Sequence, residues 1–233
     1  MADRVSLAGF QLATREAILH ILAIADIHGA SGVYEWLPEA AAKYSADLAI
    51  LAGDLLIGGL EHEQSVQARE VVIPSLRAIP APVCYIMGND DHIDLGYEDE
   101  EIRPVHGRRL DLGACGVAGY QYSPPFVGGC YEKPDEEITG DLLLIEPILN
   151  ETTIFVTHTP AYGYADRIFT GEQVGSRALA ELLARRKVLC HIHGHIHHSF
   201  GRAANHFNVA AAGRRRAMII EVPSLSHFVI EGD

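Results

Sequence analysis

The sequence predicts one α/β domain built on mixed β-sheets. Three observations favour this class: short apolar, β-branched runs recur along the chain, an amphipathic helix separates the first two, and the last three follow one another with only turns between them. A chain of 233 residues can bury one substantial core, whereas two full domains would be cramped. We therefore treat residues 1–233 as a single domain, with an N-terminal extension over residues 1–18.

The first part of the chain alternates strands with helices. Apolar residues at positions i, i+4, i+7, i+8 and i+11 from Val33 to Tyr44 predict a helix with one buried face, and this helix makes a βαβ unit with its flanking strands. A second helical stretch runs from Glu61 to Arg77, and Pro74 predicts a kink or an early end in it. Five buried strands are expected in this pattern: His20–Ala25, Asp47–Ala52, Val83–Met87, Thr153–Thr157 and Val188–Ile192.

The rest of the chain adds a long loop, a helix and closing strands. Residues 120–140 are rich in Pro and Gly and predict a long loop beside the functional site, because loops of that length in compact domains are usually functional or disordered. Ser176 is expected to cap a leucine-rich helix that ends in basic residues. Three antiparallel strands should follow: Phe207–Ala211, Ala217–Val222 and Leu225–Ile230.

Charge and composition exclude several classes of protein. The 31 Asp and Glu residues outnumber the 18 Lys and Arg residues, and the net charge of -13 argues against strong nucleic-acid binding. The longest apolar runs are far shorter than a membrane span needs, so no membrane partner is expected. The first 16 residues lack the apolar core of a signal peptide, and the four Cys residues are widely scattered, so we expect a cytoplasmic protein with reduced thiols.

Polar side chains follow the ends of the predicted strands, where α/β proteins place their binding and catalytic sites. Residues i and i+2 of extended backbone point to the same side, so Asp26 with His28, and His195 with His197, can each offer a pair of ligands to one point. Asp54, Asn89 and His158 add three more donors. Seven N and O donors without a thiolate suit Mn, Fe, Zn or Ni, and they are too many for one tetrahedral ion.

These motifs occur in a familiar order. The series DxH, GD, GN, a lone His and GHxH, from Asp26 to His197, resembles the calcineurin-like metallophosphoesterase superfamily over essentially the whole chain. The stretch from His191 to Gly201 further resembles small members with phosphodiesterase activity. The resemblance implies two mixed β-sheets packed as a sandwich and flanked by α-helices, in the four-layer αββα arrangement.

The resemblance also implies a dinuclear metal centre of the Mn, Fe, Zn or Ni type, with divalent or mixed-valence ions and manganese among the candidates. Asp26, His28 and His197 would hold the first metal, Asn89, His158 and His195 the second, and Asp54 would bridge them. A metal-bridging hydroxide is then the expected nucleophile. We expect a phosphodiesterase acting on small phosphoesters or cyclic nucleotides. The alternatives are a phosphomonoesterase or protein phosphatase, and a non-catalytic interaction protein with this fold; the oligomeric state is left open.

The chain departs from the family pattern at one position. Where the family has His after Asn, this chain has Asp90, followed by Asp91, so the usual proton donor to the leaving group is missing. Three residues are candidates for a catalytic role here, and we rank His92 ahead of Asp90, with Asp91 in the position of the family's acidic partner. Without an efficient acid, esters with good leaving groups should be favoured.

For other histidines and for the aromatic residues of the loop, a structural role is the first interpretation. His191 and His193 alternate with apolar residues inside a predicted strand and are expected to pack or to support the ligands rather than to bind metal. His198 is as consistent with an exposed turn as with a substrate contact. The aromatic residues of the 120–140 loop, Phe126 among them, are expected to pack within the loop, with stacking on a base or an aryl ester as the alternative.

Overall fold

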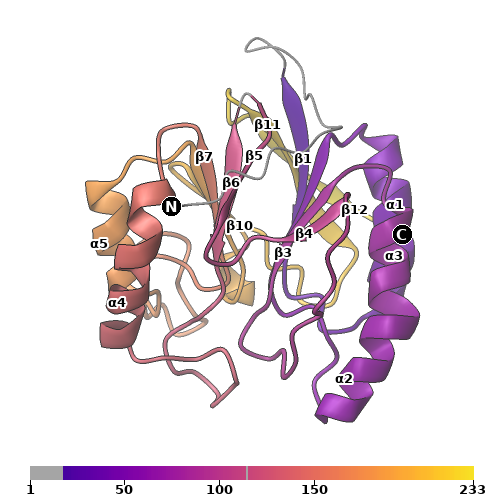
Figure 1. The fold of residues 1–233 in the computed structure, drawn as a ribbon, viewed down its shortest axis with the longest axis horizontal. Coiled ribbons are helices and arrows are strands. Elements are labelled where there is room, and N and C mark those ends of the chain that lie inside the picture. Colours follow the sequence, from indigo (N-terminus) through magenta and orange to yellow (C-terminus); the bar gives the residue numbers. More distant parts are fainter. Residues whose placement is uncertain (1–17, 114) are drawn as a thin grey trace.

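Two six-stranded sheets stack face to face, and helices cover the outer face of each (Figure 1). The structure is a computed structural model and describes residues 18–113 and 115–233; nearly all of the predicted N-terminal extension, residues 1–17, lies outside the described residues. The predicted αββα sandwich is confirmed. None of the helices in the described ranges is long and apolar enough to span a bilayer.

The first sheet is parallel at its centre and antiparallel at one edge. Its order is β12-β11-β1-β2-β3-β4, in which β1 to β4 run parallel and β11 pairs antiparallel with β1. The bounds of its strands are β1 Leu19–Ile24, β2 Leu48–Ala52, β3 Val83–Ile86, β4 Ile102–Pro104, β11 Arg216–Val222 and β12 His227–Glu231. The expected βαβ start belongs to this sheet, and so do two of the three strands expected at the end of the chain, the antiparallel β11 and β12. The third, expected over Phe207–Ala211 as an antiparallel neighbour, is instead a strand at His206–Asn208 in the second sheet.

The second sheet has the order β5-β6-β7-β8-β10-β9, with β6, β7, β8 and β10 parallel. Its strands are β5 Arg109–Asp111, β6 Gly116–Tyr120, β7 Thr153–Thr157, β8 Cys190–His193, β9 Gly201–Ala203 and β10 His206–Asn208. The two sheets touch where β1 ends, because Ala25 bonds through its backbone to Val209 and Ala211. The carboxyl ends of the parallel strands of both sheets therefore meet at one edge of the sandwich.

Three apolar clusters separate the four layers. One fills the space between the two sheets, one lies between the first sheet and helices α1 to α3, and one lies between the second sheet and helices α4 and α5. The helices are α1 Ser31–Lys43, α2 Glu61–Gln67, α3 Ile73–Ala78, α4 Asp135–Ile145 and α5 Arg177–Arg185, with a π-helical turn at Ala68–Val72 and 3-10 turns at Glu146–Ile148 and His197–Ser199. These clusters hold the sheets rigidly enough to position side chains at the shared edge.

Apart from the strand at His206–Asn208, the observed elements differ from the expected ones in two places, and the expected helix cap is confirmed. The Glu61–Arg77 stretch is interrupted by the π-helical turn, and Pro74 lies at the start of α3, directly after that turn. The 120–140 loop is shorter than expected: Tyr120 ends β6 and α4 begins at Asp135, so the loop is residues 121–134. Ser176 caps α5 as predicted, its hydroxyl accepting the Leu179 N–H at 3.1 Å.

Candidate metal centre

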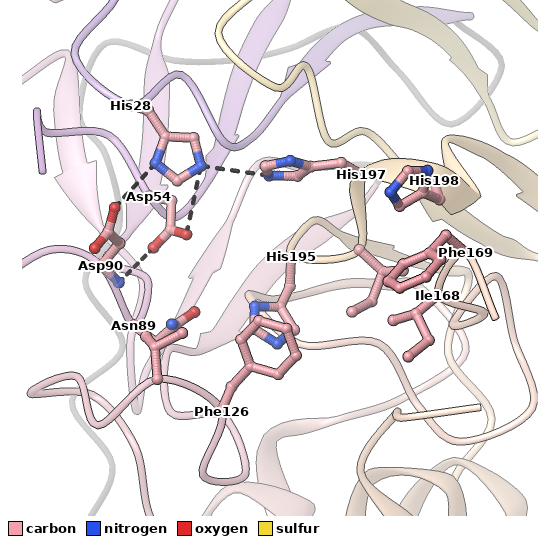
Figure 2. Close-up of a pocket in the computed structure, with 12 residues that line it drawn as sticks. His28, Asp54, Asn89, Asp90, Phe126, Ile168, Phe169, His195, His197 and His198 are labelled. Carbon is pink, nitrogen blue, oxygen red and sulfur yellow. Dashed lines mark hydrogen bonds and ion pairs between the residues drawn. The ribbon is translucent and has the colours of Figure 1, made fainter. Parts of the chain in front are cut away.

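The seven predicted ligands converge at the shared edge of the two sheets. Asp26, Asp54 and Asn89 follow β1, β2 and β3 of the first sheet, and His158 and His195 follow β7 and β8 of the second. The remaining two, His28 and His197, lie in the turn after β1 and in the 3-10 turn after β8. Figure 2 shows His28, Asp54, Asn89, His195 and His197 around one cavity.

One group of three side chains consists of Asp26, His28 and His197, whose ligand atoms lie within 4.8 Å of one another. His197 Nε2 is 3.0 Å from Asp26 Oδ1 and 3.3 Å from His28 Nε2. The other oxygen of Asp26 accepts the backbone N–H of His195 at 2.8 Å, so the fully buried carboxylate is fixed in place. The Asp26 hydrogen bond raises the pKa of His197 above its ordinary value.

A second group consists of Asp54, His158 and His195, again within 4.8 Å of one another. His158 Nε2 lies 3.3 Å from Asp54 Oδ2 and 3.0 Å from Asn89 Oδ1, which brings Asn89 into the same cluster. His158 Nδ1 donates to the carbonyl of Ala52 at 2.9 Å, and this bond orients the ring so that Nε2 faces the other candidate ligands. Asn89, His158 and Asp54 are all buried.

Asp54 stands between the two groups. Its Oδ2 is 3.3 Å from His158 Nε2 and 3.9 Å from His28 Nε2, and its Oδ1 accepts the backbone N–H of Asp90 at 2.8 Å. Burial raises the pKa of the Asp54 carboxyl, but the charge and hydrogen bond of His158 and the charge of His28 lower it by more, so Asp54 stays ionised. Beside it, the pKa of His158 is raised to about 10: burial lowers it, and the charge of Asp54 more than reverses this.

The backbone is strained where these ligands lie. Asp26, His28, Asp54 and His195 adopt positive φ angles of 56°, 48°, 52° and 70°, a region that residues other than glycine seldom enter. Gly194 passes so close to Asp26 Oδ2 that a Cβ at this position would collide with the carboxylate. Strained backbone of this kind persists only where surrounding structure enforces it, and it clusters at functional sites.

The donor set fits two divalent cations. Each group combines buried carboxylate oxygens with imidazole nitrogens and contains no thiolate, a composition that suits Mn, Fe, Zn or Ni. The Nδ1 atoms of His28 and His158 are engaged by Asp90 and by the Ala52 carbonyl, as the second nitrogen of a metal-binding imidazole usually is. Asp54 lies within reach of both groups, the position that a bridging carboxylate requires.

The three candidates for a catalytic acid have different surroundings. Asp90 lines the cavity, and its Oδ2 lies 3.2 Å from His28 Nδ1; because the carboxylate only accepts, His28 carries its proton on Nδ1. Asp91 is fully buried and accepts backbone N–H bonds from Leu55, Leu56 and Gly88. Burial, with the charge of Asp54, raises the pKa of Asp91 to about 7. Asp91 therefore links the loop after β2 to the loop after β3 and does not face the cavity.

His92 is not among the described residues that line the cavity, and its backbone N–H is held by the side chain of Gln64 at 2.6 Å. Of these two candidates, Asp90 is the one that lines the cavity, and this position favours Asp90 over the expected His92; the catalytic role of either residue stays a prediction. Gln64 is itself buried and also donates to the Asp90 carbonyl at 3.0 Å. A buried Gln on a helix gives no sequence signal of this role.

The cavity has a volume of about 370 Å³ and one polar wall and one apolar wall. Phe126 and Val127 come from the 121–134 loop, and Ile168 and Phe169 from the loop after β7, so the expectation that Phe126 packs within its own loop is not met. His198 also lines the cavity, which favours the substrate-facing alternative for this residue. Figure 2 shows Phe126 over His195 and Phe169 beside His198.

His191 and His193 lie in β8 and are fully buried, as the packing interpretation expects. His191 bonds to the Thr157 hydroxyl at 2.7 Å and to His206 at 3.0 Å. Burial lowers the pKa of His191 and, with the nearby His206, lowers that of His193 to about 3. Both imidazoles are neutral parts of the core beneath the ligands.

Comparisons with known proteins give a family model that matches most of the chain and solved structures that share its fold. The family model for calcineurin-like phosphoesterases matches residues 19–199. A UPF0046 protein of Caenorhabditis elegans is 39% identical over 56 residues, a match that covers 24% of this chain and only 19% of that protein. Among solved structures, TT1561 of Thermus thermophilus is similar with a TM-score of 0.69 at 16% identity, over 92% of this chain and 99% of that one. A dimetal phosphatase from Danio rerio is similar with a TM-score of 0.56 at 11% identity, over 92% and 99%. At these identities the two structures establish the shared fold.

Proposed function

The chain belongs to the calcineurin-like phosphoesterase family, and we propose that it is a metal-dependent phosphodiesterase for small phosphoesters, cyclic nucleotides included. One observation carries the preference for diesters. Among the described residues that line the cavity there is no Lys or Arg, while Asp54 and Asp90 contribute carboxylates. A diester with a single negative charge and two organic substituents suits such a cavity better than a doubly charged monoester does.

We assign the metal ligands as the two groups at the shared edge. Asp26, His28 and His197 would hold one cation, Asn89, His158 and His195 the other, and Asp54 would contact both. Two bound divalent cations would polarise the phosphoryl oxygens, neutralise developing charge and activate a water molecule as the nucleophile. The family is dimetal-dependent; the choice among Mn, Fe, Zn and Ni, with Mn as the first to test, is our proposal.

Asp90 takes a positioning role in this proposal. Its carboxylate fixes the Nδ1–H tautomer of His28, so that Nε2 points to the other ligands. Because Asp90 occupies the position of the family's acid and is engaged by His28, proton donation to the leaving oxygen is weak. We therefore propose that esters with acidic leaving groups, such as aryl esters, react fastest.

We also propose a cytoplasmic setting. The four Cys residues are free, with Cys84, Cys115 and Cys190 buried and Cys130 exposed, which supports a reducing compartment. The acidic composition supports small phosphoesters rather than polymeric nucleic acid as partners.

The test is hydrolysis of bis-p-nitrophenyl phosphate beside p-nitrophenyl phosphate by protein stripped of metal and refilled with Mn²⁺, Ni²⁺ or Zn²⁺. Asn89→Ala serves as the blank, because it removes a proposed ligand. Metal-dependent turnover that favours the diester supports the proposal, and preference for the monoester would replace it with a phosphomonoesterase. Turnover no higher than that of the blank with every metal would favour a non-catalytic interaction protein.

A further inference from the structure

Two loops place large apolar side chains at the mouth of the metal centre. Phe126, Val127 and Phe169 are 55%, 66% and 81% exposed, and together with Ile168 they form one wall of the cavity. Exposed apolar groups gathered beside a polar cavity usually mark a binding surface, because water contact with them is unfavourable. The opposite wall is the ligand set, so whatever fills the cavity meets cation-binding groups on one side and aromatic rings on the other (Figure 2).

The loop that carries Phe126 is fixed to a proposed metal ligand. The Glu132 carboxylate accepts the backbone N–H groups of Phe126, Val127 and Gly128, each at 2.9 Å, and the side-chain amide of Asn89 at 3.3 Å. Gly129 lies so close to the Asn89 carbonyl that any side chain there would collide with it. The position of the Phe126 ring is therefore set by the same residue that orients Asn89.

The loop that carries Phe169 is organised in a similar way. Buried Asp166 accepts the backbone N–H groups of Gly163 at 2.9 Å and Gly175 at 3.1 Å, which closes the base of the loop. The Ser199 hydroxyl donates to the Arg167 carbonyl at 2.7 Å and ties the loop to the turn that holds His197. Both rings are thus presented from anchored loops, and little ordering is needed when a ligand binds.

We propose that Phe126 and Phe169 bind a planar aromatic group attached to the scissile phosphate, either an aryl ester or a nucleobase. The inference rests on the proposed function, because it assumes that the phosphate lies against the metal ligands. Aromatic faces stack on planar rings of any substitution pattern, and such contacts typically strengthen binding about tenfold or more per ring. A cavity of about 370 Å³ accommodates a phosphoryl group with one such substituent.

Binding of two phosphonates to the Mn²⁺-loaded protein tests the proposal without chemistry. Phenylphosphonate and methylphosphonate have the same anionic group and no hydrolysable ester, and calorimetry gives their dissociation constants. We expect phenylphosphonate to bind about a hundredfold more tightly, about tenfold for each ring, and Phe126→Ala and Phe169→Ala each to reduce the ratio to about tenfold. Phe126→Leu separates stacking from apolar contact, because it keeps bulk without a ring. Phe228→Ala is the matched control, since Phe228 is an exposed ring on β12 that does not line the cavity.

Equal affinities for the two phosphonates in the wild-type protein would overturn the proposal, even if the protein hydrolyses diesters. A preference for phenylphosphonate that falls in both Phe→Ala variants, in a protein without turnover, would support it while the proposed function fails. If neither phosphonate binds, the KM for bis-p-nitrophenyl phosphate decides: a rise of about tenfold in both Phe→Ala variants supports the proposal and an unchanged KM overturns it. Adenosine 5′-phosphate compared with ribose 5-phosphate, in the same variants, tells whether a nucleobase is accepted in place of an aryl group.

Discussion

Four histidines alternate with other residues from His191 to His197. The first two are buried in the core, and the last two lie in the candidate metal centre. His191 and His193 face Thr157, His206 and apolar side chains, and none of their contacts among the described residues is to a carboxylate. His195 and His197 lie opposite Asp26 and Asp54. The spacing along the chain is identical, so carboxylate neighbours, rather than periodicity, decide which histidines are fit to bind cations.

The largest effect is expected when Asp54 is replaced, because this carboxylate lies within reach of both candidate metal-binding groups. For Asp54→Asn we expect kcat/KM on bis-p-nitrophenyl phosphate to fall by about 10³-fold or more, because cations contribute several kcal/mol of transition-state stabilisation. Metal content by mass spectrometry should fall from two ions per chain to one or fewer. Asp111→Asn, an exposed carboxylate on β5, is the control and should retain both values. Two bound ions at full turnover would show that Asp54 does not bridge.

The contact between Asp90 and His28 places a further carboxylate behind a proposed ligand. Asp90→Asn should weaken the affinity for the more weakly held metal by about 10- to 100-fold, the usual effect of losing such a partner. Competition with a chelator measures this affinity. Asp94→Asn, in the loop that follows, should leave it unchanged. An unchanged affinity in Asp90→Asn would assign this residue a role in proton transfer instead.

His206, the buried hydrogen-bond partner of His191, should make the stability of the protein depend on pH. Burial lowers the pKa of His206 to about 4, against about 6.5 in an unfolded chain, so the unfolded state binds more protons below neutrality. The contribution of His206 is complete above about pH 6.5 and is lost as pH falls toward 4, which amounts to about 2 kcal/mol between about pH 7.5 and 5. Urea unfolding of metal-free protein should therefore depend less on pH in His206→Gln. His62→Gln, at an exposed position of α2, should keep the wild-type slope.

The smallest effect is expected at His193. Its Nε2 is buried and has no hydrogen-bond partner within the described chain, so a leucine there loses little. We expect His193→Leu to change the free energy of unfolding by less than about 1 kcal/mol and turnover by less than about twofold. The same replacement at His195 should abolish most turnover. Loss of a metal ion in His193→Leu would show that His193 belongs to the metal centre, which would contradict the difference proposed between His193 and His195.

Local sequence was enough to predict the main elements of the fold. The periodicity of α1, the Ser176 cap and the apolar runs of β1, β2 and β7 depend on neighbouring residues only, and all are confirmed. The short strands β4, β5 and β9 span three residues each, too few to show a period. The start of helix α4 was not predicted, because the Pro and Gly residues before it favour a loop over residues 120–140.

The site was predictable where function follows strand ends and was not predictable where it depends on loops. The seven ligand candidates come together because each follows a strand or begins the turn after one. Phe169 and Glu132 gave no signal, because their positions depend on how loops far apart in the sequence meet. Asp91 and His92 are adjacent to Asp90, yet only tertiary contacts place Asp91 under the ligand loops and keep His92 off the cavity wall.

The proposed ligands come from both layers of the sandwich, Asp26, Asp54 and Asn89 from one sheet and His158 and His195 from the other. Cations held by both sets would therefore act as cross-links between the two sheets. Binding to the native chain alone increases the free energy of unfolding by about 2.7 kcal/mol when the free metal concentration is about a hundred times the dissociation constant. Metal supply would then control how long the folded protein persists as well as how fast it turns over.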